Sequence, residues 1–237
     1  MDTYIERGGV ITIQPYHKTK RLYEQLSAFF NIIGMAGMGT FTIMGNLVKP
    51  VGLFGPCVVM NKEYYVESGG HLQVKGEVVE DLALGGRIKQ QKIPIYCYGG
   101  KGTISFRMYP NGIWELVEGW SKGFATGAVK TYLPVLLATV LWLGGSMTVT
   151  RYFIESLINT NGFWILLWGS AYLVYAAQIH WMLFRVGNFG FYTALFYPIS
   201  LIFFLAVFLR SFFLIFVRRS VSWKGIKIDL KGKDTTK

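Results

Sequence analysis

The stretch from Thr131 to Thr150 reads TYLPVLLATVLWLGGSMTVT and carries no charged side chain. Two similar stretches follow, Ser156–Phe184 and Val186–Leu209, and the apolar character of the last one continues to Val217. A helix of about 20 residues crosses the roughly 30 Å hydrocarbon core of a bilayer. Each stretch is long enough to do so. The sequence therefore predicts membrane-spanning helices in most of the second half of the chain.

The composition also points to a membrane protein. Of the 237 residues, 52% are hydrophobic and 16% are charged, whereas soluble domains carry about 25% charged residues. The net charge of +11 suits either nucleic acid or anionic lipid headgroups. Because uncharged stretches of spanning length are present, we expect the lipid bilayer as a partner and no nucleic acid.

The number of membrane crossings stays open at two or three. A basic tail, 218–237, follows the apolar stretches, and the part before them is also basic. Positive charge favours the cytosolic side, yet three crossings would place these two parts on opposite sides. One apolar segment would then be re-entrant or interfacial. We expect a multi-pass protein of the plasma membrane with residues 1–130 in the cytosol.

Residues 1–130 alternate between strand and helix patterns, which predicts an α/β domain. The expected strands are 10–14, 52–60 and 93–98, and the expected helices are 61–66, 79–91 and 109–127, the last broken near Pro110. Membrane-spanning helices would then occupy 131–217, and the basic tail would occupy 218–237.

The segment 20–48 has a pattern of its own. It combines apolar residues at helical spacing with four glycines and no charge from Gln25 to Val48. The glycines make a complete membrane span unfavourable, so we expect an interfacial helix and loop here. The apolar stripe consists of Leu22, Leu26, Phe29, Phe30 and Ile33.

Glu80 and Asp81 are the strongest candidates for chemistry. Adjacent residues on a helix point about 100° apart. One carboxylate can therefore act as a general base while the other caps the helix or pairs with a cation. The alternative is a charged first turn that the helix macrodipole stabilises.

Other polar residues give weaker signals. His17 and His71 are expected to be structural or to contact a ligand rather than a metal. Cys57 and Cys97 lack the spacing of metal ligands and are expected to be free thiols. The loop 99–103 lacks Walker spacing and is expected to be a plain hairpin loop.

Several short motifs occur in a fixed order around the carboxylate pair. They are Gln14-Pro15-Tyr16-His17, Thr19-Lys20-Arg21, Phe54-Gly55-Pro56, Asn61-Lys62-Glu63, Gly69-Gly70-His71, Phe106-Arg107-Met108-Tyr109, Glu118-Gly119-Trp120-Ser121-Lys122 and Gly127-Ala128. With membrane helices after it, this series resembles the family 2 glycosyltransferases of the GT-A type. Within that family it is most similar to the branch that acts in staphyloxanthin-type carotenoid biosynthesis.

The resemblance implies an inverting transfer of a sugar, expected to be glucose, from a UDP-sugar to a lipid acceptor such as a carotenoid carboxylate. Asp81 matches the position of the family's catalytic base, and Glu80 is its less certain partner. Contacts to the donor diphosphate or the acceptor would come from Trp120, Lys122, Arg107, His17, His71, Gly55 and Pro56.

The chain also departs from the family pattern. The family holds Mg²⁺ or Mn²⁺ on the donor diphosphate with an Asp-x-Asp element, and this sequence contains no such element. We therefore expect the acceptor-side half of a GT-A domain followed by transmembrane helices, without metal ligands of its own. The UDP-sugar and the metal ion would bind in an absent or separate N-terminal half.

Two other functions fit the same residues. A sibling transferase would use a polyprenyl phosphate or a glycerolipid as acceptor. A non-catalytic membrane scaffold or partner subunit would keep the acceptor half but bind no donor, and the missing Asp-x-Asp element favours it. For an enzyme, the apolar stripe of 22–33 would either guide an apolar acceptor towards Asp81 or pack on the α/β core.

We expect the purified chain alone not to bind UDP-glucose at micromolar concentration in the presence of Mg²⁺ or Mn²⁺, because the sequence has no Asp-x-Asp element to hold the metal. Isothermal titration calorimetry measures this directly. Metal-dependent binding would show that the donor site lies within these residues.

Overall fold

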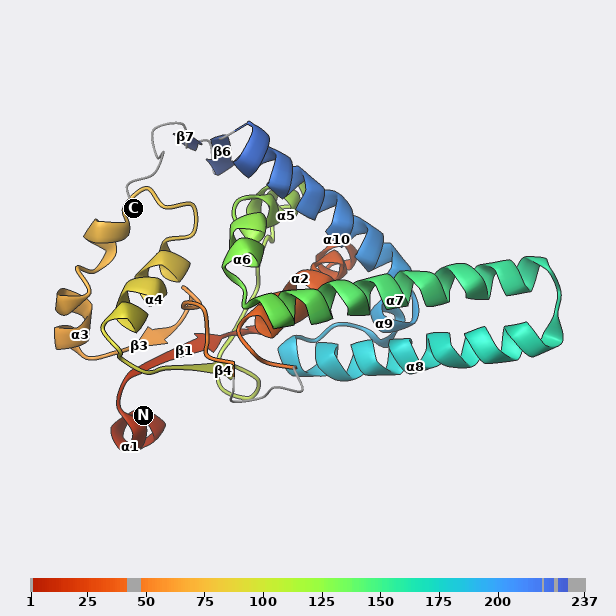
Figure 1. Ribbon diagram of the computed structural model, residues 1–237, viewed down its shortest axis with the longest axis horizontal. Helices are drawn as coiled ribbons and strands as arrows, with labels where there is room; N and C mark the ends of the chain where they lie inside the picture. Colours follow the sequence, from red (N-terminus) through yellow and green to blue (C-terminus); the bar gives the residue numbers. More distant parts are fainter. Residues whose placement is uncertain (1, 42–47, 219, 224–225, 230–237) are drawn as a thin grey trace.

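The computed structural model describes residues 2–41, 48–218, 220–223 and 226–229. Short helices and small sheets gather at one end of the protein, and a pair of long helices projects from the other end (Figure 1). The prediction of a partial α/β unit followed by long apolar helices is confirmed.

A three-stranded mixed sheet is built around β1 (Val10–Gln14). It pairs in parallel with β4 (Ile95–Gly99) and antiparallel with β3 (Val58–Val59). The strands predicted at 10–14 and 93–98 are thus present, but the predicted strand 52–60 is reduced to two residues. The chain before β3 packs closely on α4 (Glu80–Gln90) instead, where a Cβ at Gly52 would overlap Leu82.

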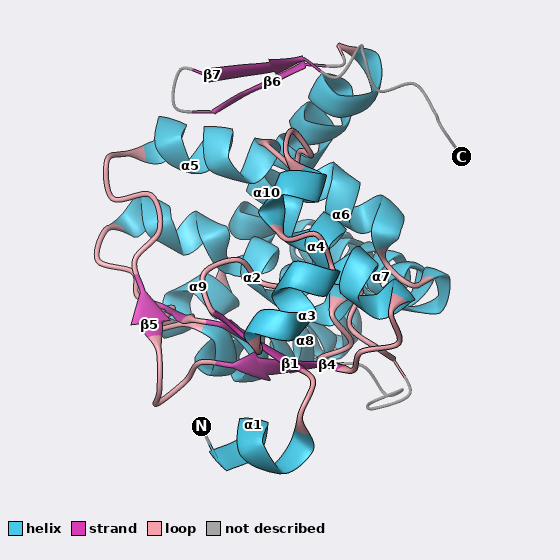
Figure 2. Ribbon diagram, turned by 90° about the vertical axis from the view of Figure 1, so that its left-hand side faces the viewer, coloured by secondary structure: helices cyan, strands magenta, loops and turns pink. Residues whose placement is uncertain are grey.

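Short helices surround this sheet (Figure 2). They are α1 (Asp2–Arg7), a 3₁₀ helix (Leu22–Ser27), α2 (Ala28–Gly37), α3 (Lys62–Glu67), a second 3₁₀ turn (His71–Val74), α5 (Ile113–Ser121) and α6 (Phe124–Lys130). A second small sheet pairs β2 (Tyr16–His17) with β5 (Ser105–Phe106) in parallel. The helices expected near 61–66 and 79–91 are confirmed, and the break expected near Pro110 lies just before α5.

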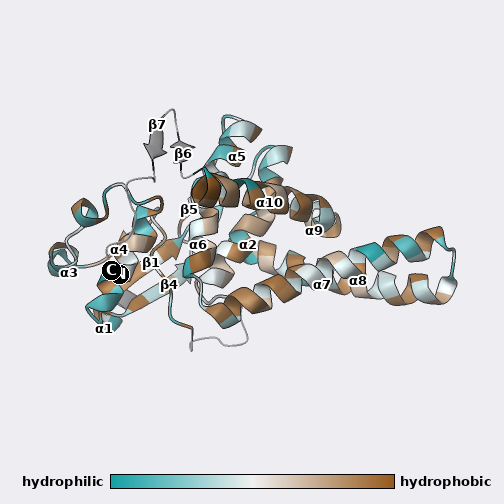
Figure 3. Cartoon of the chain, turned by 45° about the horizontal axis from the view of Figure 1, so that its top comes forward, coloured by the Kyte–Doolittle hydropathy of each residue, from teal (hydrophilic) through white to brown (hydrophobic). Residues whose placement is uncertain are grey.

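Three helical segments among the described residues are long and apolar enough to cross a membrane. They are α7 (Leu133–Ile158), α8 (Gly162–Val186) and the segment Tyr197–Val217, which consists of α10 (Tyr197–Phe212) and a terminal π-helical turn. Hydrophobic residues run along α7 and α10 (Figure 3). The short helix α9 (Phe191–Leu195) joins α8 to α10.

After α8 the chain does not run the full length of the α7–α8 pair again. The segment α9–α10 instead reverses direction partway along that pair. After α8, Asn188 returns to the α/β unit, where its side chain accepts a 2.6 Å hydrogen bond from the Thr19 amide. Yet Tyr197, at the start of α10, is fully buried with its hydroxyl 2.9 Å from Thr150 Oγ1, well along α7. At the other end, Ser211 Oγ accepts a hydrogen bond from the Ala125 amide of α6.

A hairpin follows α10 and lies beside α5, close to the α/β unit. Its strands are β6 (Ser220–Trp223) and β7 (Ile226–Asp229), which pair antiparallel. Because α10 runs from partway along α7 back towards α6, the chain enters and leaves the long helices at the same end (Figure 1). This arrangement removes the charge conflict of three full crossings.

The main apolar core joins α2 to the long helices. Phe29 and Phe30 are fully buried in a cluster with residues of α8 and α10, whereas Leu22 is 91% exposed. The expectation of one continuous stripe from Leu22 to Ile33 is therefore wrong. Leu22 lies in a 3₁₀ helix, which has three residues per turn, so its side chain falls out of phase with those of α2.

We expect two membrane crossings, α7 and α8, with the α/β unit and residue 218 on the same side of the bilayer. In a variant without Cys57 and Cys97, single cysteines at Glu67, Asn159 and Arg218 can be treated with a membrane-impermeant maleimide in sealed and inverted vesicles. Positions 67 and 218 should be labelled in vesicles of the same orientation, and position 159 should be labelled only in vesicles of the other orientation. Labelling of 218 together with Asn159 would establish three crossings.

Candidate functional site

A cavity of about 490 Å³ lies where the α/β unit meets the long helices. This volume is within the usual range of small-molecule sites, about 300–1,000 Å³. Glu80, Asp81 and Lys122 form its charged part, beside Gly55 and Pro56, and Gln14, Asn31 and Tyr109 add further polar groups. Its apolar part comes mainly from α2, α6 and the first turns of α7, and includes Ile33, Gly34, Met35, Gly37, Met38, Phe124, Gly127, Ala128, Leu136 and Thr139.

Asp81 is positioned by an unusually close approach of two backbones. It lies in the first turn of α4, and a Cβ at Gly55 would overlap its carboxylate. Only glycine at position 55 therefore lets the turn 52–56 wrap around the acid. One turn further along α4, a Cβ at Gly85 would meet the Gly52 Cα at 2.5 Å, so this turn and the helix fit closely at two points.

The pKa of the Asp81 carboxyl is raised above its usual value. Burial is the main cause, because a low-dielectric environment disfavours the charged form. The nearby carboxylate of Glu80 raises the pKa further, whereas His71 and Lys122 oppose the shift by favourable charge interaction. Asp81 thus combines access to a cavity with an increased affinity for a proton.

Trp120 lines the cavity but is held in place as a core residue. Its indole N–H donates a 3.1 Å hydrogen bond to Ser27 Oγ, and its ring stacks on Phe30 at 4.8 Å between centroids. Lys122 follows at the end of α5 and also lines the cavity. The two residues therefore contribute a fixed aromatic wall and a cation.

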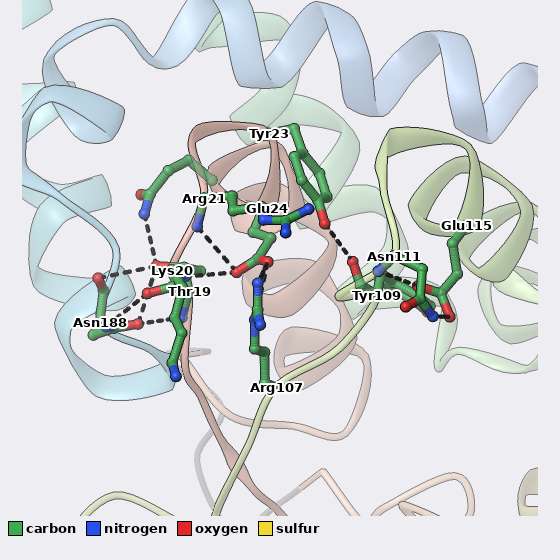
Figure 4. A network of polar contacts seen from close by, with 11 residues as sticks. Thr19, Lys20, Arg21, Tyr23, Glu24, Arg107, Tyr109, Asn111, Glu115 and Asn188 are labelled. Carbon is green, nitrogen blue, oxygen red and sulfur yellow. Dashed lines mark hydrogen bonds and ion pairs between the residues drawn. The ribbon is translucent and has the colours of Figure 1, made fainter.

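Arg107 is not part of the cavity wall, although its neighbours Phe106 and Met108 are. Its Nε donates a 3.0 Å hydrogen bond to Oε1 of Glu24, which is fully buried (Figure 4). The other Glu24 oxygen accepts a 2.6 Å hydrogen bond from the Lys20 amide. Arg107 is therefore engaged in neutralising a buried carboxylate.

The two predicted histidines also lie outside the cavity lining. His17 is fully buried with its Nδ1 3.1 Å from Asn31 Nδ2, and burial lowers its pKa to about 4. It is neutral at physiological pH. His71 is exposed, and its Nδ1 lies 3.0 Å from the Tyr65 hydroxyl. It remains near enough to Asp81 to affect the pKa of that carboxyl.

Within the described residues, no group of three histidine, cysteine, aspartate or glutamate side chains could hold a metal ion. The divalent metal that the family resemblance implies therefore has no matching ligand set in this part of the chain. Cys57 and Cys97 are free thiols.

The sequence indicated the apolar wall only in part, through Phe30 and Ile33 of the predicted stripe, and it did not indicate Asn31. Asn31 is 2% exposed and lines the cavity, and its Oδ1 has no hydrogen-bond partner among the described residues. One signal was available, because Asn31 is the polar residue inside the apolar run 28–33. Such a residue usually marks a specific contact, since a buried polar group without a partner is unfavourable.

Comparison with known proteins identifies relatives of the chain. It is 35% identical over 217 residues to the 4,4'-diaponeurosporenoate glycosyltransferase of Staphylococcus aureus strain USA300, with 92% of this chain aligned. The same figures hold for the proteins of strains NCTC 8325 / PS 47 and MRSA252. The chain is homologous to these glycosyltransferases. The resemblance predicted from the motifs is thus confirmed.

The homology covers part of each relative. The chain spans 58% of the length of the 4,4'-diaponeurosporenoate glycosyltransferases that it matches. No protein-family model matches the chain, and no solved structure matches it significantly. The relationship therefore rests on the aligned sequences of these glycosyltransferases.

Arg107→Gln should destabilise the protein strongly, because it leaves the buried Glu24 carboxylate without its counter-ion. The Arg107 side chain is 28% exposed, so water offsets part of the loss, but the fully buried Glu24 keeps its charge without a partner. Thermal unfolding of the detergent-solubilised protein should show a clear fall in Tm. The control variant Lys89→Gln removes a positive charge from an exposed side chain and should leave Tm nearly unchanged. An unaltered Tm in Arg107→Gln would show that Arg107 is available for a ligand.

Proposed function

We propose that this chain forms the acceptor-side part of a membrane-bound glycosyltransferase that transfers a sugar to a lipid-like carboxylic acid of the carotenoid type. The single observation that carries the proposal is one cavity that contains Asp81 and Lys122 and is also lined by the first turns of α7. Such a cavity can hold a polar head at the acid while the apolar part of the same molecule contacts apolar helices. The homology to 4,4'-diaponeurosporenoate glycosyltransferases supports this acceptor class.

The donor in this proposal is a UDP-sugar, with glucose as the expected sugar, and the transfer inverts the anomeric centre. An acceptor oxygen forms a bond to the anomeric carbon from the face opposite the diphosphate, and the bond from that carbon to the diphosphate oxygen breaks. UDP leaves with the bonding electron pair. Asp81 lies where an acceptor head would be placed, on the polar part of the cavity.

Asp81 has a different role for each kind of acceptor. An acceptor hydroxyl must lose a proton, and a carboxylate within hydrogen-bond reach can take it. A carboxylic acid acceptor is already ionised at neutral pH, so Asp81 then orients the head. Two carboxylates in one cavity repel each other, and Lys122 is the cation in the same polar part that offsets this repulsion.

Among the described residues, no group of three side chains could hold a metal ion on the donor diphosphate, so no step of this mechanism passes through a metal. We assign donor and metal binding to the part of the relatives that the chain does not cover. Lys122 remains the candidate cation for negative charge that develops on the leaving group.

A non-catalytic scaffold is the second candidate, and one observation favours it. The described residues provide no group of metal ligands, so the chain has no evident means of binding the donor. A scaffold would not require an accessible carboxylate, and substitution of Asp81 separates the two functions.

Asp81→Asn should abolish transfer in a complete enzyme that joins this chain to a donor-binding half. For a hydroxyl acceptor this change removes a positioned general base, which commonly lowers the rate about 10²- to 10⁴-fold, and for a carboxylate acceptor it removes the group that orients the head. Turnover of both kinds of acceptor should be measured together with Tm, which should change little because asparagine is isosteric. Glu80→Gln, on the exposed neighbour, should have a milder effect. Parental turnover in Asp81→Asn would disprove the assignment.

The pH dependence of transfer should report the ionisation of Asp81. The raised pKa of its carboxyl means that activity is lost, as the pH falls, at a higher pH than for an ordinary aspartate. Glu80→Gln removes a charge that raises this pKa, so the acid limb of the kcat/KM profile should move to lower pH. Lys122→Gln should move it to higher pH. If neither variant moves the acid limb, that limb reports the ionisation of a group other than Asp81.

A further inference from the structure

The residues of α2 that line the cavity overlap only in part with the predicted stripe, because Phe30 and Ile33 belong to both sets. Phe29 packs in the core, whereas Ile33, Gly34 and Gly37 line the cavity. The opposite wall comes from the junction of α6 with α7 and includes Ala128 and Thr131. Most of these side chains are small, so they leave space between the two walls.

We propose that this space is an acceptor slot, which binds the extended apolar chain of a carboxylic acid and uses Gly34 to set the girth of the chain that it admits. The acceptor slot is defined by Ile33, Gly34 and Gly37 on α2 and by Ala128, Thr131 and Leu136 at the α6–α7 junction. The inference rests on the proposed function and extends it to a residue that selects the acceptor.

Gly34 is placed where glycine is otherwise unfavourable. It lies within α2, where glycine destabilises a helix relative to alanine, and its backbone is not in the left-handed region that requires glycine. Among the described residues, a Cβ at Gly34 would meet no heavy atom within 4 Å. Because Gly34 also lines the cavity, a larger side chain here would extend into the space that the acceptor slot offers to a ligand.

The acceptor slot is narrow at a neighbouring point. A Cβ at Gly37 would come 3.2 Å from Thr131 Oγ1, which is tight for such a contact. The two walls therefore meet at this point, which bounds the slot, and an acceptor chain passes beside it. In this proposal the bounded slot admits a thin extended chain and excludes a fused ring system.

The position of the slot suits an acceptor that comes from the bilayer. Leu136 and Thr139 line the cavity from the first two turns of α7, which is one of the helices long enough to cross a membrane. Asp81 and Lys122 line the same cavity. A molecule with its carboxylate near Lys122 can therefore extend its apolar chain towards the membrane without passing through water.

Photo-labelling tests this slot without a sugar donor. The purified chain in lipid nanodiscs is irradiated with palmitic acid that carries a diazirine on its chain, and adducts are located by mass spectrometry. The expected adducts lie on α2 between 33 and 38 and on α7 between 136 and 139. Unlabelled all-trans-parinaric acid, a linear polyene carboxylic acid, should compete, and cholesteryl hemisuccinate, a carboxylic acid on fused rings, should not.

Substitutions at Gly34 make the test specific. Gly34→Leu should abolish these adducts, whereas Gly144→Leu should retain them. Gly144 is the matched control, because it is also a helical glycine with no heavy atom within 4 Å of a Cβ, but it does not line the cavity. Gly34→Ala should weaken labelling while raising Tm, since alanine favours the helix. This milder variant keeps the test valid if Gly34→Leu does not fold.

The outcomes separate this proposal from the proposed function. Adducts spread over the lipid-facing sides of α7 and α8, or adducts that Gly34→Leu leaves unchanged, would overturn the slot. Slot-specific adducts in a protein whose complete form transfers no sugar would instead refute only the enzymatic function. A complete enzyme in which Gly34→Leu leaves the acceptor KM unchanged would refute the slot alone.

Discussion

The structure depends on the burial of α2 between the α/β unit and the long apolar helices. Phe30 is fully buried, stacks on Trp120 at 4.8 Å and meets Phe204 edge-on at 5.0 Å. Aromatic pairs of this kind contribute about 0.5–1.5 kcal/mol each beyond the area that they bury. The contacts connect α2, α5 and α10 in a single core. The cavity walls are therefore fixed relative to the helices that are long enough to cross the membrane.

This shared core explains why several predicted site residues have structural roles. Trp120 and His17 are both on elements that meet α2, and each forms a hydrogen bond with it or with the 3₁₀ turn before it. Arg107 neutralises Glu24 in that same turn. Polar groups at a boundary between sheet and membrane helices must be paired, because burial without a partner is costly. Of the predicted site residues that carry a charge, those that line the cavity are Asp81, Glu80 and Lys122.

Secondary structure could be predicted where the residues of a single helix or strand carry the sequence pattern of that element. The strand 10–14 and the helix that starts at Glu80 follow from alternation and from acids in a first turn. The prediction of a continuous stripe over 22–33 was wrong because it assumed 3.6 residues per turn. A 3₁₀ helix has three residues per turn, so its side chains point in other directions than those of an α-helix. The pairing of Arg107 with Glu24 could not be seen either, because 83 residues separate the two in sequence. The motifs did identify Gly55 and Asp81, which the structure brings into direct contact.

The direction of α10 bears on the charge pattern of the chain, in which basic residues occur both before and after the long helices. Tyr172 donates a 2.6 Å hydrogen bond to the Leu195 carbonyl, and Tyr197 donates one to the Ser146 carbonyl. Irregular backbone within a membrane is stable only when protein groups satisfy it. These two tyrosines thus stabilise a turn partway along the α7–α8 pair. With α7 and α8 as the two expected crossings, the same turn returns the chain to α6, and residue 218 and the basic α/β unit then lie on one side of the bilayer.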